Sequence, residues 1–342
     1  MKERRGEYLN ILIAGGNGFI GSHTYVALRE RYPEAQLVIA DNLSNSTVQS
    51  LENLRKLVGE QILFHEIDFC DELAVESIFE KYRFDGIIHF ASFKAVGESV
   101  MNPLKYYRNN ITSTLNLVKF CLKYQVHKFV FSSSATVYGD RESPLMETQP
   151  LLPASNPYGD TKAMCERILI AVAKANPEFG VSVLRYFNPV GAHESGLIGE
   201  APNGIPNNLM PYIAKVSKGE LQRLQVFGGD YPTVDGTGVR DYIHVMDLAE
   251  GHVAALEYLK TGAHIYNLGT GKGISVLQLL QTFEQVNGVA VPYEIVERRP
   301  GDLAIIYADV RKAEKELNWK AKRSVEEMCK HAWNFEKHFV LI

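Results

Sequence analysis

Residues 9–28, LNILIAGGNGFIGSHTYVAL, decide the fold class. An apolar, strand-like run from Leu9 to Ala14 leads into glycines at Gly15, Gly18 and Gly21, and a helix-like run follows. In this spacing the first glycine makes a tight turn, the second lets backbone approach a pyrophosphate, and the third lets helix and strand pack closely. The phosphates would bind at the helix N-terminus, where free N–H groups and the helix dipole favour negative charge. The stretch therefore predicts a dinucleotide-binding unit.

Asp41 strengthens this prediction. It ends the next strand-like run, Leu37 to Asp41, about twenty residues past the last glycine, where a carboxylate can accept from adenosine ribose hydroxyls. A 2′-phosphate there would meet like charge, so NAD is favoured over NADP. The structural alternative is a strand-end turn, because Asp41 is followed by Asn42. A second glycine string, 269–273, lacks the phosphate-loop spacing and is predicted to be a turn into a helix near Val276.

Short apolar runs alternate with amphipathic stretches through the first half of the chain. Parallel neighbouring strands need crossovers of about a dozen residues or more, so the alternation predicts an α/β fold with a doubly wound, Rossmann-like parallel sheet. The expected strands are Leu9 to Ala14, Leu37 to Asp41, Ile62 to Glu66, Gly86 to Phe90, Lys128 to Ser132 and Val181 to Tyr186, and the expected helices are Phe19 to Arg31, Leu73 to Tyr82, Leu104 to Tyr124 and Pro157 to Ala175.

The amino-acid composition of the chain changes after Tyr186. Residues 188–208 are rich in Gly, Pro and Asn, and long loops of this kind tend to be functional. Helical periodicity then returns over Val245 to Leu259, Val276 to Val286 and Val310 to Leu317, with strands expected at Ile265 to Leu268 and Pro292 to Val296. We expect an NAD-binding domain over residues 1–187 and a smaller, discontinuous α/β substrate domain over 188–342, with a segment near 240–262 returning to the first domain.

Composition excludes several classes of protein. The 342 residues are 46% hydrophobic and 22% charged, as in ordinary globular proteins, and the net charge of −4 leaves no basic field for nucleic acid. Four widely spaced cysteines indicate reduced thiols in a cytoplasmic protein. The charged first seven residues predict no signal peptide, and no apolar run approaches the ~18 residues of a membrane span. The histidines show no metal-ligand spacing, so no metal site is predicted.

Tyr158 and Lys162 form the chemical motif that stands out. Lying four residues apart on a predicted helix, they share one face, and an ammonium beside a phenol favours the phenolate needed for proton abstraction. A second Tyr-x-x-x-Lys, at Tyr124 and Lys128, spans a helix end and a strand start and is attributed to chance. Ser133 lies at the carboxyl end of a predicted strand, where open α/β sheets place ligands, and is expected to hydrogen-bond a substrate hydroxyl; a plain turn is the alternative.

Together these features resemble the extended short-chain dehydrogenase/reductase family, and within it the enzymes that epimerise nucleotide sugars. Longer matching stretches make the resemblance specific, and it extends from about Leu9 to about Trp333. The matching stretches are residues 93–99 (FKAVGES), 185–193 (RYFNPVGAH), 204–212 (GIPNNLMPY) and 235–248 (DGTGVRDYIHVMDL).

The resemblance implies an isomerase with tightly bound NAD that is not consumed, and a homodimer built through helices of the cofactor domain. The implied reaction interconverts UDP-glucose and UDP-galactose by reversible oxidation at C4 through a 4-keto sugar. Whether UDP-N-acetylglucosamine and UDP-N-acetylgalactosamine also react is left open.

The resemblance also implies roles for individual residues. The implied catalytic residues are Tyr158 as the base, Ser133 as its hydrogen-bonding neighbour and Lys162, which would hold the nicotinamide ribose and tune the tyrosine. The implied NAD contacts are Gly15, Gly18, Phe19, Ile20, Gly21, Asp41, Asn42, Asn45, Ser46, Asp68, Phe90, Lys94, Asn109, Tyr158, Lys162 and Tyr186. The implied nucleotide-sugar contacts are Ser133, Asn188, Asn208, Leu209, Phe227, Arg240, Arg299, Asp302 and Ile306, of which the two arginines suit a pyrophosphate because a guanidinium is a planar, bidentate donor.

Three positions depart from the family pattern. Ser92 replaces a usual glycine, Asp160 replaces a common lysine, and Ile306 lies where a bulky tyrosine in relatives is taken to exclude N-acetylated sugars. Two other functions compete with epimerisation. A nucleotide-sugar 4,6-dehydratase would need an Asp-Glu pair where this chain has Ser134 and Ala135. A non-catalytic, cofactor-sensing protein on the same fold would have no need of the tyrosine, lysine and serine.

Overall fold

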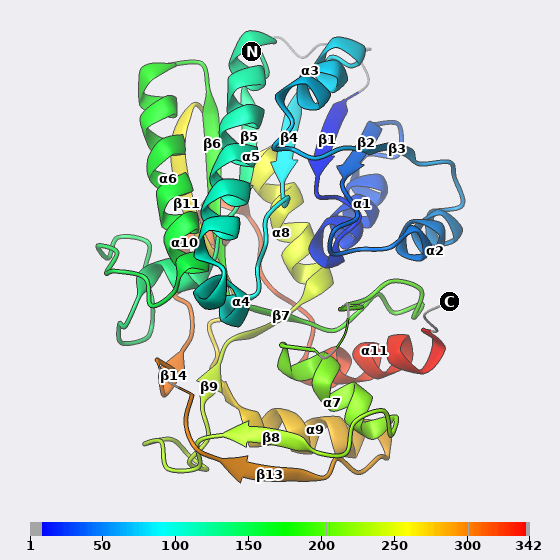
Figure 1. The fold of residues 1–342 in the computed structure, drawn as a ribbon, viewed down its shortest axis with the longest axis vertical. Helices are drawn as coiled ribbons and strands as arrows, with labels where there is room; N and C mark the ends of the chain where they lie inside the picture. Colours follow the sequence, from blue (N-terminus) through cyan, green and yellow to red (C-terminus); the bar gives the residue numbers. More distant parts are fainter. Residues whose placement is uncertain (1–8, 203, 205, 300, 340–342) are drawn as a thin grey trace.

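The large half of the molecule is built on a seven-stranded parallel sheet (Figure 1). The computed structural model describes residues 9–202, 204, 206–299 and 301–339, so the charged N-terminal stretch behind the signal-peptide prediction lies outside the described residues. The sheet order is β11-β6-β5-β4-β1-β2-β3, with β4 in the middle. Its strands are β1 (Asn10–Ala14), β2 (Gln36–Asp41), β3 (Leu63–Glu66), β4 (Gly86–His89), β5 (Lys128–Ser132), β6 (Gly180–Tyr186) and β11 (Gly262–Leu268).

Helices cover both faces of this sheet, which gives the doubly wound Rossmann-like fold that the sequence predicts. One face packs against α1 (Phe19–Arg31), α2 (Val48–Val58), α8 (Val245–Glu257) and α10 (Arg311–Leu317). The other face packs against α3 (Glu72–Lys81), α5 (Pro103–Lys123) and α6 (Pro157–Ala175). The central strands are buried on both sides, which explains why their sequences are continuous apolar runs.

A smaller layer of helices and short strands lies beyond the carboxyl ends of the parallel strands (Figure 1). Its own hydrophobic core joins three helices to short strand pairs. It contains α7 (Leu209–Ser217), α9 (Val276–Asn287) and α11 (Val325–His338), the pairs β7 (Asn188–Val190) with β10 (Tyr242–His244) and β8 (Leu224–Phe227) with β13 (Tyr293–Val296), and the sheet β12 (Ile274–Ser275), β9 (Val239–Arg240) and β14 (Ile305–Ile306).

More of the chain returns to the large half than the segment near 240–262 that the sequence predicts. Both α8 and the whole of β11 belong to the large half, and β11 pairs with β6 over Gly262–Leu268. Helix α10 also packs there. The glycine string 269–273 follows β11 and is confirmed as a turn: Asp241 accepts hydrogen bonds from the backbone N–H groups of Thr270 (2.8 Å) and Gly271 (3.0 Å).

Four helices of the structure have no counterpart among the sequence predictions: α2, α4 (Val96–Met101), α7 and α11. Helix α11 carried a readable signal, since Ser324 and Glu327 form a capping box at its start. Helix α2 carried a signal as well, because its apolar residues Leu51, Leu54, Leu57 and Val58 recur at helical spacing and pack against the core. Across the described ranges, no helix has the length and apolar character that crossing a membrane would demand.

Candidate active site

A deep pocket opens where the parallel strands end, between the two halves of the molecule. Residues that follow β1, β2, β4 and β6 line it, together with residues 197–202 and two aromatic side chains from the end of the chain, Phe335 and Phe339. All the residues expected around NAD lie on its wall: Gly15, Gly18, Phe19, Ile20, Gly21, Asp41, Asn42, Asn45, Ser46, Asp68, Phe90, Lys94, Asn109, Tyr158, Lys162 and Tyr186.

The glycine loop forms the anion-binding end of the pocket. Gly15 has a φ of +75°, and a Cβ there would lie 2.6 Å from the Ala91 nitrogen. A Cβ at Gly21 would lie 2.5 Å from the Gly15 oxygen, so neither position tolerates a side chain. Gly18 is the N-cap of α1, and the described residues provide no side-chain cap there. The helix N-terminus is therefore left to bind a phosphate through its N–H groups.

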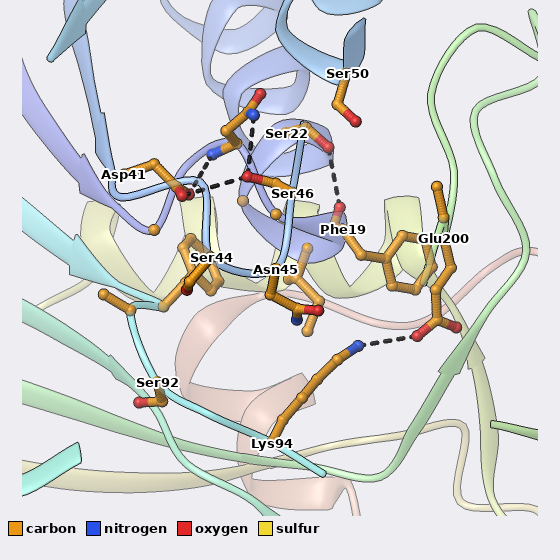
Figure 2. A pocket seen from close by; sticks show the side chains of 18 of the residues that line it. Phe19, Ser22, Asp41, Ser44, Asn45, Ser46, Ser50, Ser92, Lys94 and Glu200 are labelled. Carbon is orange, nitrogen blue, oxygen red and sulfur yellow. Dashed lines mark hydrogen bonds and ion pairs between the residues drawn. The ribbon is translucent and has the colours of Figure 1, made fainter. Parts of the chain in front are cut away.

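Asp41 lies on the pocket wall and also forms the strand-end turn that the sequence allowed. Its carboxylate lines the pocket and also accepts hydrogen bonds from the N–H groups of Asn17 (3.1 Å) and Leu43 (2.9 Å) and from the Ser46 hydroxyl (3.3 Å), so it holds the loop after β2 (Figure 2). Burial raises the pKa of Asp41, against the hydrogen bonds that lower it. The side-chain oxygen of Asn17 is buried with no partner among the described residues. This corner is polar, preorganised and suited to a ribose.

Helix α6 carries the tyrosine and the lysine into the pocket. The helix begins with proline, and the Asn156 side chain caps it by accepting from the Gly159 N–H at 2.9 Å. Tyr158 and Lys162 lie one turn apart and both line the pocket, although each is at most 5% exposed. A strong helix start thus fixes the position of both functional groups.

The lysine is held by oxygen acceptors. Its Nζ donates to the Ser92 hydroxyl at 2.9 Å and to the Ser132 carbonyl at 2.8 Å, and burial lowers the pKa of Lys162 to about 8. The departure from glycine at Ser92 therefore adds a partner for the lysine. The second departure, Asp160, accepts a hydrogen bond from the Tyr107 hydroxyl at 2.7 Å.

Burial dominates the electrostatics of Tyr158. Burial raises the pKa of Tyr158 well above 10, and the nearby Tyr186 raises it further, while a side-chain hydrogen bond from Ser134 lowers it. Burial therefore favours the neutral phenol, and a positive charge beside it would favour the phenolate that can act as a base.

Ser133 is not placed where the sequence predicted. It is fully buried, and its hydroxyl donates at 2.5 Å to Glu166, which lies one turn beyond Lys162 on α6 and forms a buried ion pair with Arg185 at 2.6 Å. The neighbouring Ser134 provides the hydroxyl beside Tyr158. The prediction for Ser133 is corrected to Ser134, because alternate side chains at a strand end point to opposite sides.

The residues expected to bind the nucleotide sugar lie in the smaller layer, apart from the described wall of this pocket. Arg240 Nη2 lies 3.1 Å from the Asp302 carboxylate, and the register of β9 with β14 pairs Arg240 with Ile306. The Arg299 guanidinium stacks 3.8 Å above the Phe227 ring. The remaining three, Asn188, Asn208 and Leu209, begin β7, cap α7 and begin α7.

The sequence analysis missed Ser134, next to Tyr158, and Glu200, on the pocket wall. Ser134 was passed over for its neighbour, and only a side-chain direction separates the two. Glu200 lines the pocket, accepts from Lys94 at 2.9 Å and lies in a loop that carries no motif by itself (Figure 2). No local pattern could have found Glu200, because its partners are distant in sequence.

The fold and the pocket define a dinucleotide-binding enzyme of the Rossmann type. A sequence model of the family described as GDP-mannose 4,6 dehydratase matches residues 12–332. UDP-glucose 4-epimerase of Bacillus subtilis (strain 168) is 56% identical, over 95% of this chain and 96% of the relative, and that of Caenorhabditis elegans is 50% identical, over 96% and 97%.

Solved structures agree with these relatives. The UDP-glucose 4-epimerase of Bifidobacterium longum, in complex with NAD+ and UDP, has a TM-score of 0.92 and 48% identity, with 96% of this chain and 98% of that chain covered. The Stenotrophomonas maltophila enzyme, with bound NAD and formylated UDP-arabinopyranose, has a TM-score of 0.93 and 44% identity, with the same coverage. The chain belongs to the GDP-mannose 4,6 dehydratase family, and within it to the UDP-glucose 4-epimerases.

Proposed function

We propose that this protein is an NAD-dependent epimerase that interconverts UDP-glucose and UDP-galactose by oxidising and re-reducing C4. The observation that carries the proposal is the placement of Tyr158 and Lys162 on the wall of a dinucleotide pocket, with the Ser134 hydroxyl next to Tyr158, in a chain about half identical to UDP-glucose 4-epimerases. A reacting sugar carbon can then lie between a proton acceptor and a hydride acceptor.

The residues that line the pocket suit NAD. The α1 N-terminus and the open space at Gly18 suit the pyrophosphate, and Asp41 suits the adenosine ribose while opposing a 2′-phosphate. Lys162, with its nearly buried ammonium group, would hold the other ribose. When bound, NAD supplies the hydride acceptor and donor and brings a positively charged ring to this part of the site.

Tyr158 exchanges the proton of the C4 hydroxyl. Because burial keeps its pKa high, the phenol holds its proton until positive charge is close, and Ser134 lowers that pKa by hydrogen bonding. The first half-reaction takes the hydroxyl proton to Tyr158 and leaves a 4-keto sugar. The second returns the proton from Tyr158 to the oxygen while hydride enters the opposite face of the ketone, so the net reaction needs no added reductant.

The UDP part of the substrate would bind in the smaller layer. Arg240 and Arg299 offer two guanidinium groups to a pyrophosphate, and Phe227 offers a ring face. Holding UDP by charge at one end leaves the hexose with few fixed contacts, and the ketone can turn between the two hydride transfers. Ile306, paired with Arg240 across β9 and β14, is proposed to set the space for substituents on the sugar. An isoleucine there leaves room for UDP-N-acetylglucosamine as a secondary substrate.

A 4,6-dehydratase activity is the chemical rival, because it begins with the same 4-ketone. It requires a further acid and base after the strand-end serine, and with Ser134 as that serine the next two residues are Ala135 and Thr136, neither of which is a carboxylic acid. Ser134 also caps the short 3-10 helix η1 (Ala135–Tyr138), where its oxygen accepts from the Thr136 N–H at 3.3 Å. Without a carboxyl pair there, this chain has no elimination chemistry to add to the ketone.

The assembly proposed is a homodimer. Three exposed leucines, Leu104, Leu115 and Leu122, lie along one face of α5, since they are separated by about three and two turns of 3.6 residues, and Met101 of α4 adds to the patch. Leu115→Glu should convert the dimer into a monomer, as measured by light scattering.

We place the enzyme in the cytoplasm, where its four free cysteines would stay reduced.

The decisive experiment incubates the purified protein with UDP-galactose and no added NAD. We expect UDP-glucose to form, and cofactor released by denaturing the protein to be NAD. A parallel incubation with UDP-N-acetylgalactosamine tests breadth. Protein that holds NAD yet leaves UDP-galactose unchanged, or that releases a 4-keto-6-deoxy sugar, would overturn the proposed reaction.

A further inference from the structure

Residues 197–202, here called the strap, form a wall of the NAD pocket although they come from the smaller layer. All six line the pocket, in the connection between β7 and α7. The strap is packed in place: a Cβ at Gly199 would lie 2.4 Å from the ring of Phe335 in α11, and the His193 N–H donates to the Ile198 carbonyl at 3.1 Å. The strap therefore has a defined position against the pocket.

Glu200 attaches the strap to both halves of the site. One oxygen of its carboxylate accepts from Lys94 Nζ at 2.9 Å and from Asn208 Nδ2 at 2.6 Å (the bond to Lys94 is drawn in Figure 2). Lys94 lines the NAD pocket and follows β4, whereas Asn208 caps α7 in the smaller layer. The Glu200 side chain is only 9% exposed. A single, largely buried carboxylate thus joins a cofactor residue to a residue proposed to bind the nucleotide sugar.

A carboxylate is an unexpected group in a pocket for a pyrophosphate. By itself it would repel the anion, and it cannot donate a hydrogen bond to a phosphate oxygen. Phosphate recognition therefore does not account for Glu200. Its two bonds do: they neutralise the carboxylate with Lys94 and fix the distance between the strap and the loop after β4.

We propose that Glu200 is a positioning residue that holds the strap closed over bound NAD through Lys94 and, through Asn208, couples retention of the cofactor to the nucleotide-sugar site. The inference rests on the proposed function for the identity of the two ligands. Since coupling between two binding sites is reciprocal, a change at Asn208 should alter the release of NAD even though Asn208 is not among the described residues that line its pocket.

The test measures release of NAD from the holoenzyme, by diluting it into an excess of isotopically labelled NAD and following the unlabelled NAD that leaves the protein. Glu200→Ala should release NAD about tenfold faster than the wild type, the factor that corresponds to losing about 1.4 kcal/mol. Asn208→Ala should release it a few-fold faster, and the double variant no faster than Glu200→Ala, because both changes break one connection. Glu194→Ala, an exposed carboxylate in the same loop, is the matched control and should leave release unchanged.

The alternatives give opposite results. If the only effect of Glu200 is that its negative charge repels the pyrophosphate of NAD, Glu200→Ala releases NAD more slowly, and the proposal is overturned. It is also overturned if Asn208→Ala changes the KM for UDP-galactose but leaves NAD release unchanged. Glu200→Gln keeps the side-chain volume and provides a folded variant for the comparison if the alanine variant does not fold. Faster release of NAD from Glu200→Gln supports the positioning role of Glu200, and unchanged or slower release opposes it. Wild-type protein that holds no NAD would overturn the proposed function as well. If the wild type is an active epimerase and the Glu200 variants retain NAD equally well, only the positioning role of Glu200 is overturned.

Discussion

Replacing the two neighbouring serines one at a time separates structure from chemistry in this site. In Ser133→Ala the buried carboxylate of Glu166 loses a donor at 2.5 Å but keeps Arg185, its ion-pair partner. A hydrogen bond to a charged group is worth about 1.5–3 kcal/mol, so the free energy of unfolding should fall by about that amount. Turnover should change by no more than about threefold, which corresponds to less than about 1 kcal/mol in the barrier.

Ser134→Ala should give the opposite pattern. The lost hydrogen bond to Tyr158 raises the pKa of a phenol that burial already keeps high, and a bond worth about 1.4–3 kcal/mol to the transition state corresponds to a loss of about 10- to 100-fold in kcat. The free energy of unfolding should fall by less than in Ser133→Ala, because Ser134 is bonded to neutral partners.

Both quantities are measurable on the same preparations. Urea unfolding is followed with saturating NAD in every sample, so that ligand stabilisation is equal, and kcat is measured with UDP-galactose. Ser182→Ala is the matched control, a buried serine on the adjacent strand whose hydroxyl donates only to the Ala255 carbonyl at 3.3 Å. If Ser133→Ala lowers kcat as far as Ser134→Ala and leaves unfolding unchanged, Ser133 is the reacting neighbour of Tyr158 and our assignment is wrong.

Further substitutions test the base, the lysine, the glycine loop and the sugar site. Tyr158→Phe should bind UDP-galactose with little change but lose at least about 1000-fold in kcat, measured by calorimetry and product formation; near-normal turnover would contradict its role. The pKa of Lys162 is lowered to about 8, so the folded protein binds fewer protons than the unfolded chain between about pH 8 and 10.5. The free energy of unfolding of the cofactor-free protein should therefore rise with pH through this window, and the rise should be absent in Lys162→Met. Gly21→Ala places a methyl group against loop backbone and should reduce bound NAD by about tenfold or more, whereas Gly97→Ala, with no atom within 4 Å of the added Cβ, should retain it. Ile306→Tyr should lower activity toward UDP-N-acetylglucosamine more than toward UDP-glucose; equal exclusion of the acetylated sugar by both proteins would count against the breadth proposed for this chain.

The elements that the sequence placed well are those with strong local patterns. Helices α1 and α6 begin and end where they were expected, because a glycine turn precedes the first and a capped proline start defines the second. Strand β5 matches as well, as a continuous apolar run buried in the centre of the sheet. In contrast, α7 and β8 gained their structure from the core of the smaller layer, where Met210, Ile213 and Val226 pack together, and short elements of this kind have weak patterns of their own.

The amino-acid sequence by itself determined the doubly wound sheet, the phosphate-binding turn at Gly15 to Gly21 and the tyrosine and lysine on one helix face, because each depends on residues within a few positions of one another. Only the tertiary structure decided which serine lies next to Tyr158, that burial is the largest influence on the pKa of that phenol, and that Glu200 joins Lys94 to Asn208. The physical reason is that side-chain direction, burial and contacts between distant segments arise from packing, and the order of residues along the chain does not contain them locally.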